Sequence, residues 1–249
     1  MRRSAWPAAV GFVLIAMGGV FLLRELGFGI DPGFLWAAII IGLGVVVLYG
    51  ALRPRPTTPA SVVIDRQDAS DLTLDIGIGG GGFTLAAGAS ALVEVASRRD
   101  DILATVDRSG GAVRVLLRQN VDWFLRTWVG AAGWDIRVPA DVPVTLEIGA
   151  GAGEVQLDLG AVLLRRGRVN LGAAKSVVTL PRPIGDVPLA ISAGAASVTI
   201  VIPPGIEAKV TSQGGLLSVS GRTETPGYHA ATNRVTVTLQ GGATSVTVV

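Results

Sequence analysis

Two long apolar runs near the start constrain this chain more than any other feature. Residues 6–23 and residues 34–52 contain no charged side chain, and residues 24–33 separate them with the turn sequence Asp31-Pro32-Gly33. At about 1.5 Å of rise per residue, helices of this length reach about 27–29 Å, close to the hydrocarbon thickness of a bilayer. Residues 1–52 are therefore predicted to form a transmembrane α-helical hairpin.

A cleaved signal peptide followed by a single anchor is the alternative. Arg2 and Arg3 would form its basic region, and Ala16-Met17-Gly18 offers a cleavage site. The uncleaved hairpin is favoured because the apolar run continues beyond that site. In the second run, Ala38 and Gly42 form a small-xxx-small pair that suits close helix packing, either within the hairpin, which is favoured, or on a partner.

The basic residues around the two runs predict the topology. Arg2, Arg3, Arg53 and Arg55 flank the hairpin, whereas the turn contains Arg24 alone. Because basic residues are retained in the cytoplasm, both termini and the C-terminal domain are expected to be cytoplasmic. An integral cell-membrane protein is thus predicted.

The charge outside the hairpin is close to neutral. Residues 1–60 contain five Arg, one Glu and one Asp, which leaves sixteen basic and seventeen acidic side chains for the rest of the chain. A neutral C-terminal part lacks the basic footprint of nucleic-acid binding, so no nucleic-acid partner is expected.

A proline-rich linker, residues 53–60, separates the hairpin from a part with strand character. From residue 61 to residue 249 the sequence alternates Val, Thr, Ile and Leu with polar residues and is punctuated by Gly and Ala. An all-β domain is predicted over residues 61–249.

Its second half repeats. Five stretches in residues 144–249 read as strand, small-residue break and strand, and the valines after the breaks are 22, 21, 21 and 27 residues apart; they are Val155, Val177, Val198, Val219 and Val246. A weaker copy occupies residues 72–88. This spacing predicts a solenoid-like stack of repeats of about 21–22 residues, whose small residues let neighbouring corners approach. An antiparallel meander is the less favoured alternative, since the breaks lack Asn-Gly and Asp-Gly turns.

Residues 102–139 break the period and concentrate large rings. These aromatic residues are Trp123, Phe124, Trp128 and Trp134. We expect them to cap an open end of the stack, and the alternative is a partner-binding or membrane-apposed patch.

Glycine-rich segments and lone polar residues offer little chemistry. Residues 77–82 and 149–153 superficially resemble phosphate-binding loops, but strands rather than helices are expected to follow them. Residues 172–176 place Lys175 and Ser176 as a P-loop would, but Ala174 stands where glycine is required. His229 is the single histidine and there is no cysteine, so neither a triad nor a zinc site is expected.

Clustered carboxylates are not predicted to form a functional site either. The run Asp65, Asp68, Asp71 and Asp75 matches no calcium loop, and Glu147, Glu154 and Asp158 are explained by alternation of exposed charges. No catalytic residue, metal or cofactor is predicted, and the protein is expected not to be an enzyme.

The chain resembles a known family in both parts. Residues 11–28 and 35–50 look like the two-helix region of LiaI/LiaF-type envelope-stress proteins, and residues 134–159, 189–205 and 231–249 resemble the toastrack-type β domains of LiaF-like proteins. The resemblance implies a membrane-anchored, non-enzymatic regulator whose partner is a sensor histidine kinase of the cell-envelope stress response or another envelope-stress membrane protein. A membrane-attached scaffold that forms homo-oligomers through its β repeats is the alternative.

Overall fold

The computed structural model describes residues 59–98, 101–120 and 132–249. The predicted hairpin, with Ala38 and Gly42, and most of the linker lie outside these residues. Within the described ranges, no helix is long and apolar enough to cross a membrane. Residues Arg55–Val249 form one compact unit, which is the β domain treated below.

Twelve strands make up the described part of this domain. In chain order they are β1 (Ala60–Ile64), β2 (Asp71–Ala87), β3 (Val93–Ser97), β4 (Ile102–Ser109), β5 (Ala112–Gln119), β6 (Ala132–Val138), β7 (Val144–Asp158), β8 (Leu164–Thr179), β9 (Asp186–Ala193), β10 (Ser197–Val201), β11 (Ala208–Gly221) and β12 (Arg234–Val248). The predicted all-β architecture is confirmed for the described residues.

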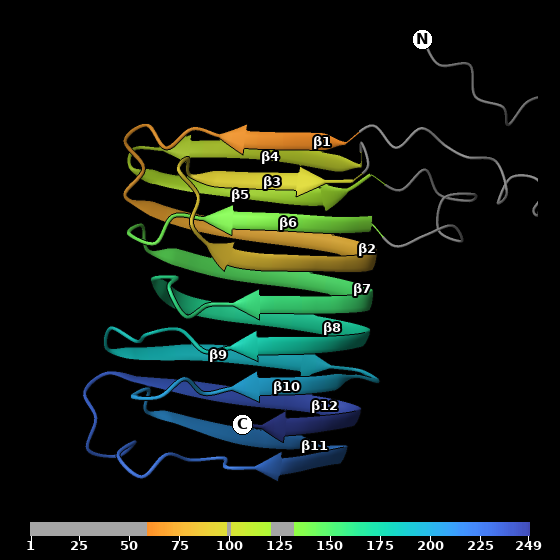
Figure 1. Cartoon of the computed structure of the whole chain (residues 1–249), viewed down its shortest axis with the longest axis vertical. Coiled ribbons are helices and arrows are strands. Elements are labelled where there is room, and N and C mark those ends of the chain that lie inside the picture. The colour runs from red at the N-terminus through yellow and green to blue at the C-terminus, as the bar shows by residue number, and fades with distance from the viewer. Residues whose placement is uncertain (1–58, 99–100, 121–131) are drawn as a thin grey trace, which may run out of the picture. The chain divides into compact units, whose positions relative to one another are not determined.

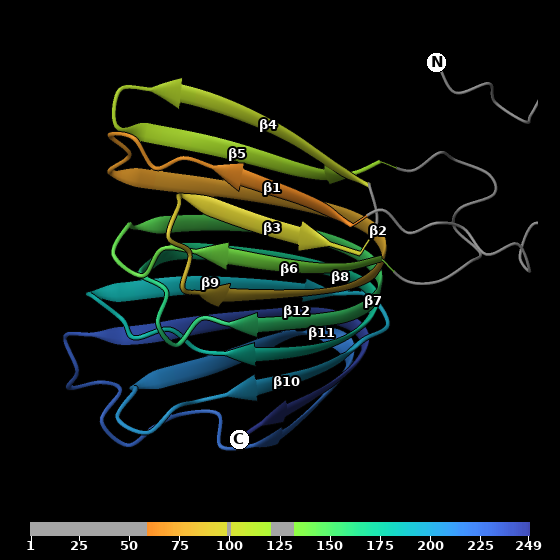
Figure 2. The same ribbon diagram turned by 45° about the horizontal axis from the view of Figure 1, so that its top comes forward.

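The long strands bend in the middle, so the sheet folds into two facing layers joined along one edge (Figures 1 and 2). The first half of β2 pairs with β5 and its second half with β6, while both halves pair with β7. Strands β9 and β10 are the two halves of one such unit, interrupted by three residues. We call the layer with β5 and β9 the first layer, the layer with β6 and β10 the second layer, and the bend the corner.

Parallel pairing stacks these units, as the repeat predicted. Strands β7, β8, β9, β10, β11 and β12 pair with one another in parallel and nearly in register. The antiparallel meander is therefore wrong for residues 144–249. Antiparallel pairs occur at the other end of the stack, between β1 and β3, β3 and β6, and β4 and β5.

The stacking order departs from the chain order at both ends. Strand β12 lies between the β9–β10 unit and β11, and β2 lies between β5–β6 and β7. In this internal position Val235, Val237 and Leu239 of β12 are all buried. Strand β11 places the polar, exposed Ser212 opposite Leu239, which suits a terminal rung.

Ladders of inward side chains fill the space between the layers. In the second layer one ladder runs through Trp134, Phe83, Val155, Ser176, Val198, Val246 and Val219 on neighbouring strands. The nearly equal spacing of the repeat valines predicts equivalent positions for them in one inward ladder. This prediction is wrong for Val177, because Val155 and Val198 both align with Ser176. Val177 aligns instead with Gln156 and Thr199 on the outer surface. The repeat alignment placed β8 one residue out of register.

Stacked glycines form the corner. A Cβ atom on Gly151 would lie 2.3 Å from the carbonyl oxygen of Gly79, and one on Gly172 would lie 2.3 Å from that of Gly151. Gly194 and Gly242 continue this column, where the corresponding approaches would be 3.2 Å. The backbones of successive units thus meet where a side chain has no room, which is the reason predicted for the small residues.

Candidate functional site

Of the four aromatic residues expected to cap the stack, Trp134 is the one that lies within the described residues. Trp134 is 2% exposed and pairs with Phe83 inside the second layer, so its ring packs in the core. Strand β6 is separated from the end of the stack by β3 and β1. Trp123, Phe124 and Trp128 lie outside the described residues.

A buried carboxylate holds Trp134 in place. The indole Nε1 donates to Asp101 Oδ1 at 3.1 Å, and Ser97 Oγ donates to the same oxygen at 2.8 Å. Asp101 is 5% exposed, and the amide of Gln119 completes its surroundings by donating to Oδ2 at 3.5 Å. Gln119 also bonds the backbone of Gly79 and Gly80, so this group of residues connects the two layers at the corner.

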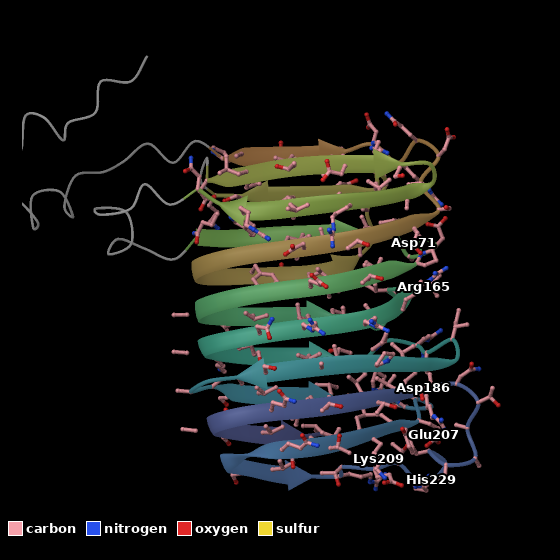
Figure 3. The ribbon with its side chains drawn as sticks, turned by 180° about the vertical axis from the view of Figure 1, so that it is seen from behind. Asp71, Arg165, Asp186, Glu207, Lys209 and His229 are labelled. Atoms are coloured by element: carbon pink, nitrogen blue, oxygen red, sulfur yellow. The ribbon has the colours of Figure 1, made fainter. Side chains whose placement is uncertain are left out.

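Several of the residues considered for phosphate, calcium or acid–base chemistry lie within strands, and two of the carboxylates form ion pairs. Residues 77–82 and 149–153 lie inside β2 and β7, and neither precedes a helix. Asp71 pairs with Arg165 at 3.2 Å (Figure 3), and Asp75 pairs with Arg118 at 2.9 Å. The hydrogen bond from Arg118 to Asp75 raises the pKa of the guanidinium. Glu147, Glu154 and Asp158 all lie on β7.

A polar cluster lies beside the starts of β9, β11 and β12. Tyr228 is 7% exposed; its hydroxyl lies 2.8 Å from Thr236 Oγ1, which donates to Asp186 Oδ1 at 2.9 Å. Since Thr236 gives its proton to Asp186, the tyrosine hydroxyl is the donor of the first bond. The cations of Lys209 and Arg234 lie 5.8 Å and 5.3 Å from the centre of the tyrosine ring, within range of cation–π attraction.

His229 belongs to the outer part of this cluster. Its Nε2 lies 2.9 Å from Glu224 Oε1, while Lys209 Nζ lies 2.9 Å from Glu224 Oε2 (Figure 3 labels the histidine and the lysine). The hydrogen bond from Lys209, followed by the positive charges nearby, lowers the pKa of Glu224. His229 thus takes part in an exposed cluster of polar and charged side chains. The described residues contain no group of three or more metal-ligating side chains.

Outward ladders of side chains run across neighbouring strands on both layers of the domain. On the second layer, Gln156, Val177, Thr199, Thr247 and Ser220 follow one another across neighbouring strands. Beside them runs a second row, and its members are Glu154, Lys175, Ser197, Ser245 and Ser218. Neighbouring strands are about 4.8 Å apart, so the two rows form a regular array of mostly short polar side chains.

A shallow groove runs along the corner next to the first layer. Its volume is about 570 Å³, and the side chains of Asn170, Ser192 and Gln240 line one side. The stacked glycines Gly172 and Gly194 also line it. These polar residues align on successive strands, which again gives a periodic surface rather than an enclosed pocket.

Sequence reasoning missed the Asp101 group and the cluster around Tyr228. Both bring together residues from distant parts of the chain, and the alternation of apolar and polar residues indicates neither. The isolated PGYH turn at residues 226–229 was the available signal for the second cluster.

One of the solved structures that resemble this chain supports the fold. None of the curated proteins matches the chain. A Clostridium sporogenes structure described as a "putative cell adhesion protein" superposes with a TM-score of 0.69 at 15% identity, covering 77% of this chain and 98% of that one. A Bacteroides fragilis structure described as a "putative adhesin" gives a TM-score of 0.31 at 10% identity, covering 77% of this chain and 96% of that one.

The first superposition supports the fold alone, because its sequence identity is low. The family comparison is more specific. The family described as the N-terminal domain of toast_rack, DUF2154, matches residues 54–201, which is more than half of the sequence and includes β1 to β10. The chain therefore belongs to the toast-rack family.

Proposed function

We propose that this protein is a membrane-anchored, non-enzymatic regulator whose β domain is a docking platform for a sensor histidine kinase of the cell-envelope stress response. The outward array on the second layer is the observation that carries the proposal. Repeat domains bind macromolecules through such continuous surfaces of equivalent positions. The apolar runs in residues 1–52 and the resemblance to LiaF-like proteins support the membrane anchor and the partner.

Co-purification from detergent-solubilised membranes at native expression tests the partner. A sensor kinase should be recovered with the chain. Thr199→Arg, on the second layer, should reduce that recovery, whereas Thr238→Arg places the same charge on the first layer and serves as the matched control. Recovery of chaperones and lipid without a kinase would contradict the proposal.

The proposed topology has its own test. The arginines that flank the hairpin support a cytoplasmic β domain. A reporter that is active only in the cytoplasm should therefore be active when fused after Val249. Cleavage of the β domain by protease added to intact cells would contradict this arrangement.

A scaffold is the second candidate function, and the β11 edge favours it. Residues 211–221 contain no charge and no proline, although natural edge strands usually use both to prevent pairing with another sheet. Among the described residues, the chain covers only the start of this edge, through the bridge between Lys209 and Glu224. Concentration-dependent oligomers of the full chain in detergent would support the scaffold, and a monomer at tens of micromolar would count against it.

A further inference from the structure

Strand β11 ends the stack, and a segment of the same chain covers the start of its free edge. The backbone N of Val210 donates to the backbone oxygen of Thr223 at 2.7 Å, and the backbone N of Thr225 donates to that of Ala208 at 3.0 Å. Thr225 Oγ1 also accepts from the backbone N of Ala208 at 2.9 Å. We call residues 222–231 the strap, and these bonds make its first part a short antiparallel partner of β11.

Side chains hold the strap mainly through polar contacts. Glu224 pairs with Lys209 of β11 at 2.9 Å and with His229 of the strap itself at 2.9 Å (Figure 3 labels the lysine and the histidine). Of the strap's residues, all of which the structure describes, Tyr228 alone is buried, and the ammonium of Lys209 lies 5.8 Å from the centre of its ring. A segment held by exposed ion pairs, a few hydrogen bonds and one ring is released more easily than a strand of the core.

The rest of the β11 edge is open and suits pairing with another strand. Among the described strands, β11 pairs with β12 alone, and residues 211–221 contain neither a charge nor a proline. Residues 208–214 lie opposite the part of β12 that pairs with β9, and residues 218–221 lie opposite the part that pairs with β10. The edge therefore runs along both layers, and the strap pairs with its start in the first layer.

The strap occupies a place that a second copy of β11 would need. A two-fold axis, the commonest symmetry of homodimers, sets two β11 edges antiparallel, which is the direction in which the strap already pairs. In a dimer paired along the whole edge, the backbone groups of Ala208 and Val210 would bond to the second copy, but here they bond to Thr225 and Thr223. The strap and a second copy therefore compete for the same hydrogen bonds.

We propose that the strap is an autoinhibitory contact, which limits pairing of β11 with β11 of a second copy and frees the whole edge when it is released. The inference rests on the scaffold, the second candidate function above, and names its interface and its regulation. A second copy is the occupant because two uncharged β11 edges match, whereas the opposite end of the stack offers β4, which contains the charged Asp107 and Arg108. End-to-end growth of the stack is thereby disfavoured, and a closed dimer is expected.

A disulfide that locks the strap tests the competition. Lys209 and Glu224 are bridge partners flanked by the two backbone bonds, so they form a non-hydrogen-bonded antiparallel pair whose Cα atoms, about 4.5 Å apart, suit a disulfide. The chain contains no cysteine, so Lys209→Cys combined with Glu224→Cys introduces one possible bond within the chain. Reduction leaves the strap without either the disulfide or the ion pair. Sedimentation velocity of the full chain in detergent should then show a dimer dissociation constant at least about tenfold lower in the reduced form than in the oxidised form.

Controls separate release of the strap from other causes. The native chain tests the effect of the reductant, and a non-reducing gel confirms that the disulfide forms within one chain. Glu224→Gln, which weakens the strap without cysteine, should also lower the dissociation constant of the dimer. Asp141→Asn breaks another exposed ion pair, with Arg66 at 2.8 Å, and should leave that constant unchanged.

The possible outcomes distinguish this inference from the scaffold itself. Equal association of the oxidised and reduced forms, in a chain whose native form dimerises, overturns the inference alone. Association that weakens on reduction would place the strap in the interface and contradict its inhibitory role. A chain that stays monomeric in every form at tens of micromolar overturns the scaffold and the inference together. If the reduced form recovers more kinase from membranes and gains no dimer, the kinase occupies the edge and the proposed occupant is wrong.

Discussion

Individual residues alternate between the core and the outer surface, and Ser176 is a polar residue at a core position. Val155 and Val198 are each about 1% exposed, and Ser176 occupies the position between them. Ser176 is also 1% exposed, and its Oγ has no hydrogen-bond partner among the described residues. A buried hydroxyl without a partner loses its hydration and gains nothing in return.

Replacing Ser176 should therefore stabilise the domain. Ser176→Ala removes the unsatisfied hydroxyl and is expected to raise the free energy of unfolding by about 1 kcal/mol in urea titrations. Ser197→Ala, at an exposed position on the next strand, is the control and should change it little. A loss of stability in Ser176→Ala would show that the hydroxyl has a partner.

Alanine substitutions at inward and outward positions of one strand should differ in how much stability they remove. Val155→Ala removes buried methyl groups and should destabilise the domain by about 1–3 kcal/mol. Gln156→Ala, one residue later and exposed, should stay within about 0.5 kcal/mol. Thermal melts compare the two variants, and equal losses would contradict the register of β7.

Protonation of Glu224 should lower the stability of the domain at acidic pH. Its pKa is lowered in the folded domain, first by the hydrogen bond from Lys209, so its contribution is present above the unfolded pKa, near 4.5, and is lost as the pH falls through the lower folded value. Glu224→Gln should thus be less stable than the native chain at neutral pH and equally stable well below pH 4.5 in urea titrations. A stability difference that persists in strong acid would assign the effect to packing.

At the scale of the strand, the corner decides which residues the repeat tolerates. Each long strand bends at the corner, where its backbone packs directly against the backbone of the neighbouring unit. Gly153 has a φ of 137°, a conformation that favours glycine. The repeat and its small-residue breaks were predictable from sequence because the constraint recurs in every unit. The register of β8 was not, since Ser176 and Val177 both suit a strand and only the neighbouring strands select which side chain points inward.

Replacing a glycine should destabilise the domain where backbones pack together at the corner, and should cost little stability where a side chain has room. Gly151→Ala places a Cβ atom against the carbonyl of Gly79, and overpacking of this kind costs about 1–3 kcal/mol or more. Gly133 lies in β6, where an added Cβ atom would meet no other atom within 4 Å, and it provides the control. Unfolding of Gly151→Ala at the same urea concentration as Gly133→Ala would contradict the tight glycine column.

At the scale of the whole β domain, the stack has two different ends and two long faces. The sequence could predict stacked parallel units. It could not predict that β12 would lie between the β9–β10 unit and β11, or that β2 would lie between β5–β6 and β7. Those choices depend on which strand offers more apolar surface for burial once all units are present, and β12 has the inward Leu239 where β11 has Ser212. The Asp101 group was equally hidden, because its members come from β3, β5 and β6 and the residue before β4.

Docking on the second layer is the central functional claim, and site-specific photo-crosslinking in native membranes tests it most directly. A photoreactive residue at Thr199 or Thr247 lies on the outward array of the second layer, and one at Thr238 lies on the first layer. We expect a covalent adduct with a sensor histidine kinase from residues 199 and 247 and little from residue 238. Absence of a kinase adduct from all three positions, in a chain that is correctly inserted, would contradict docking on this layer.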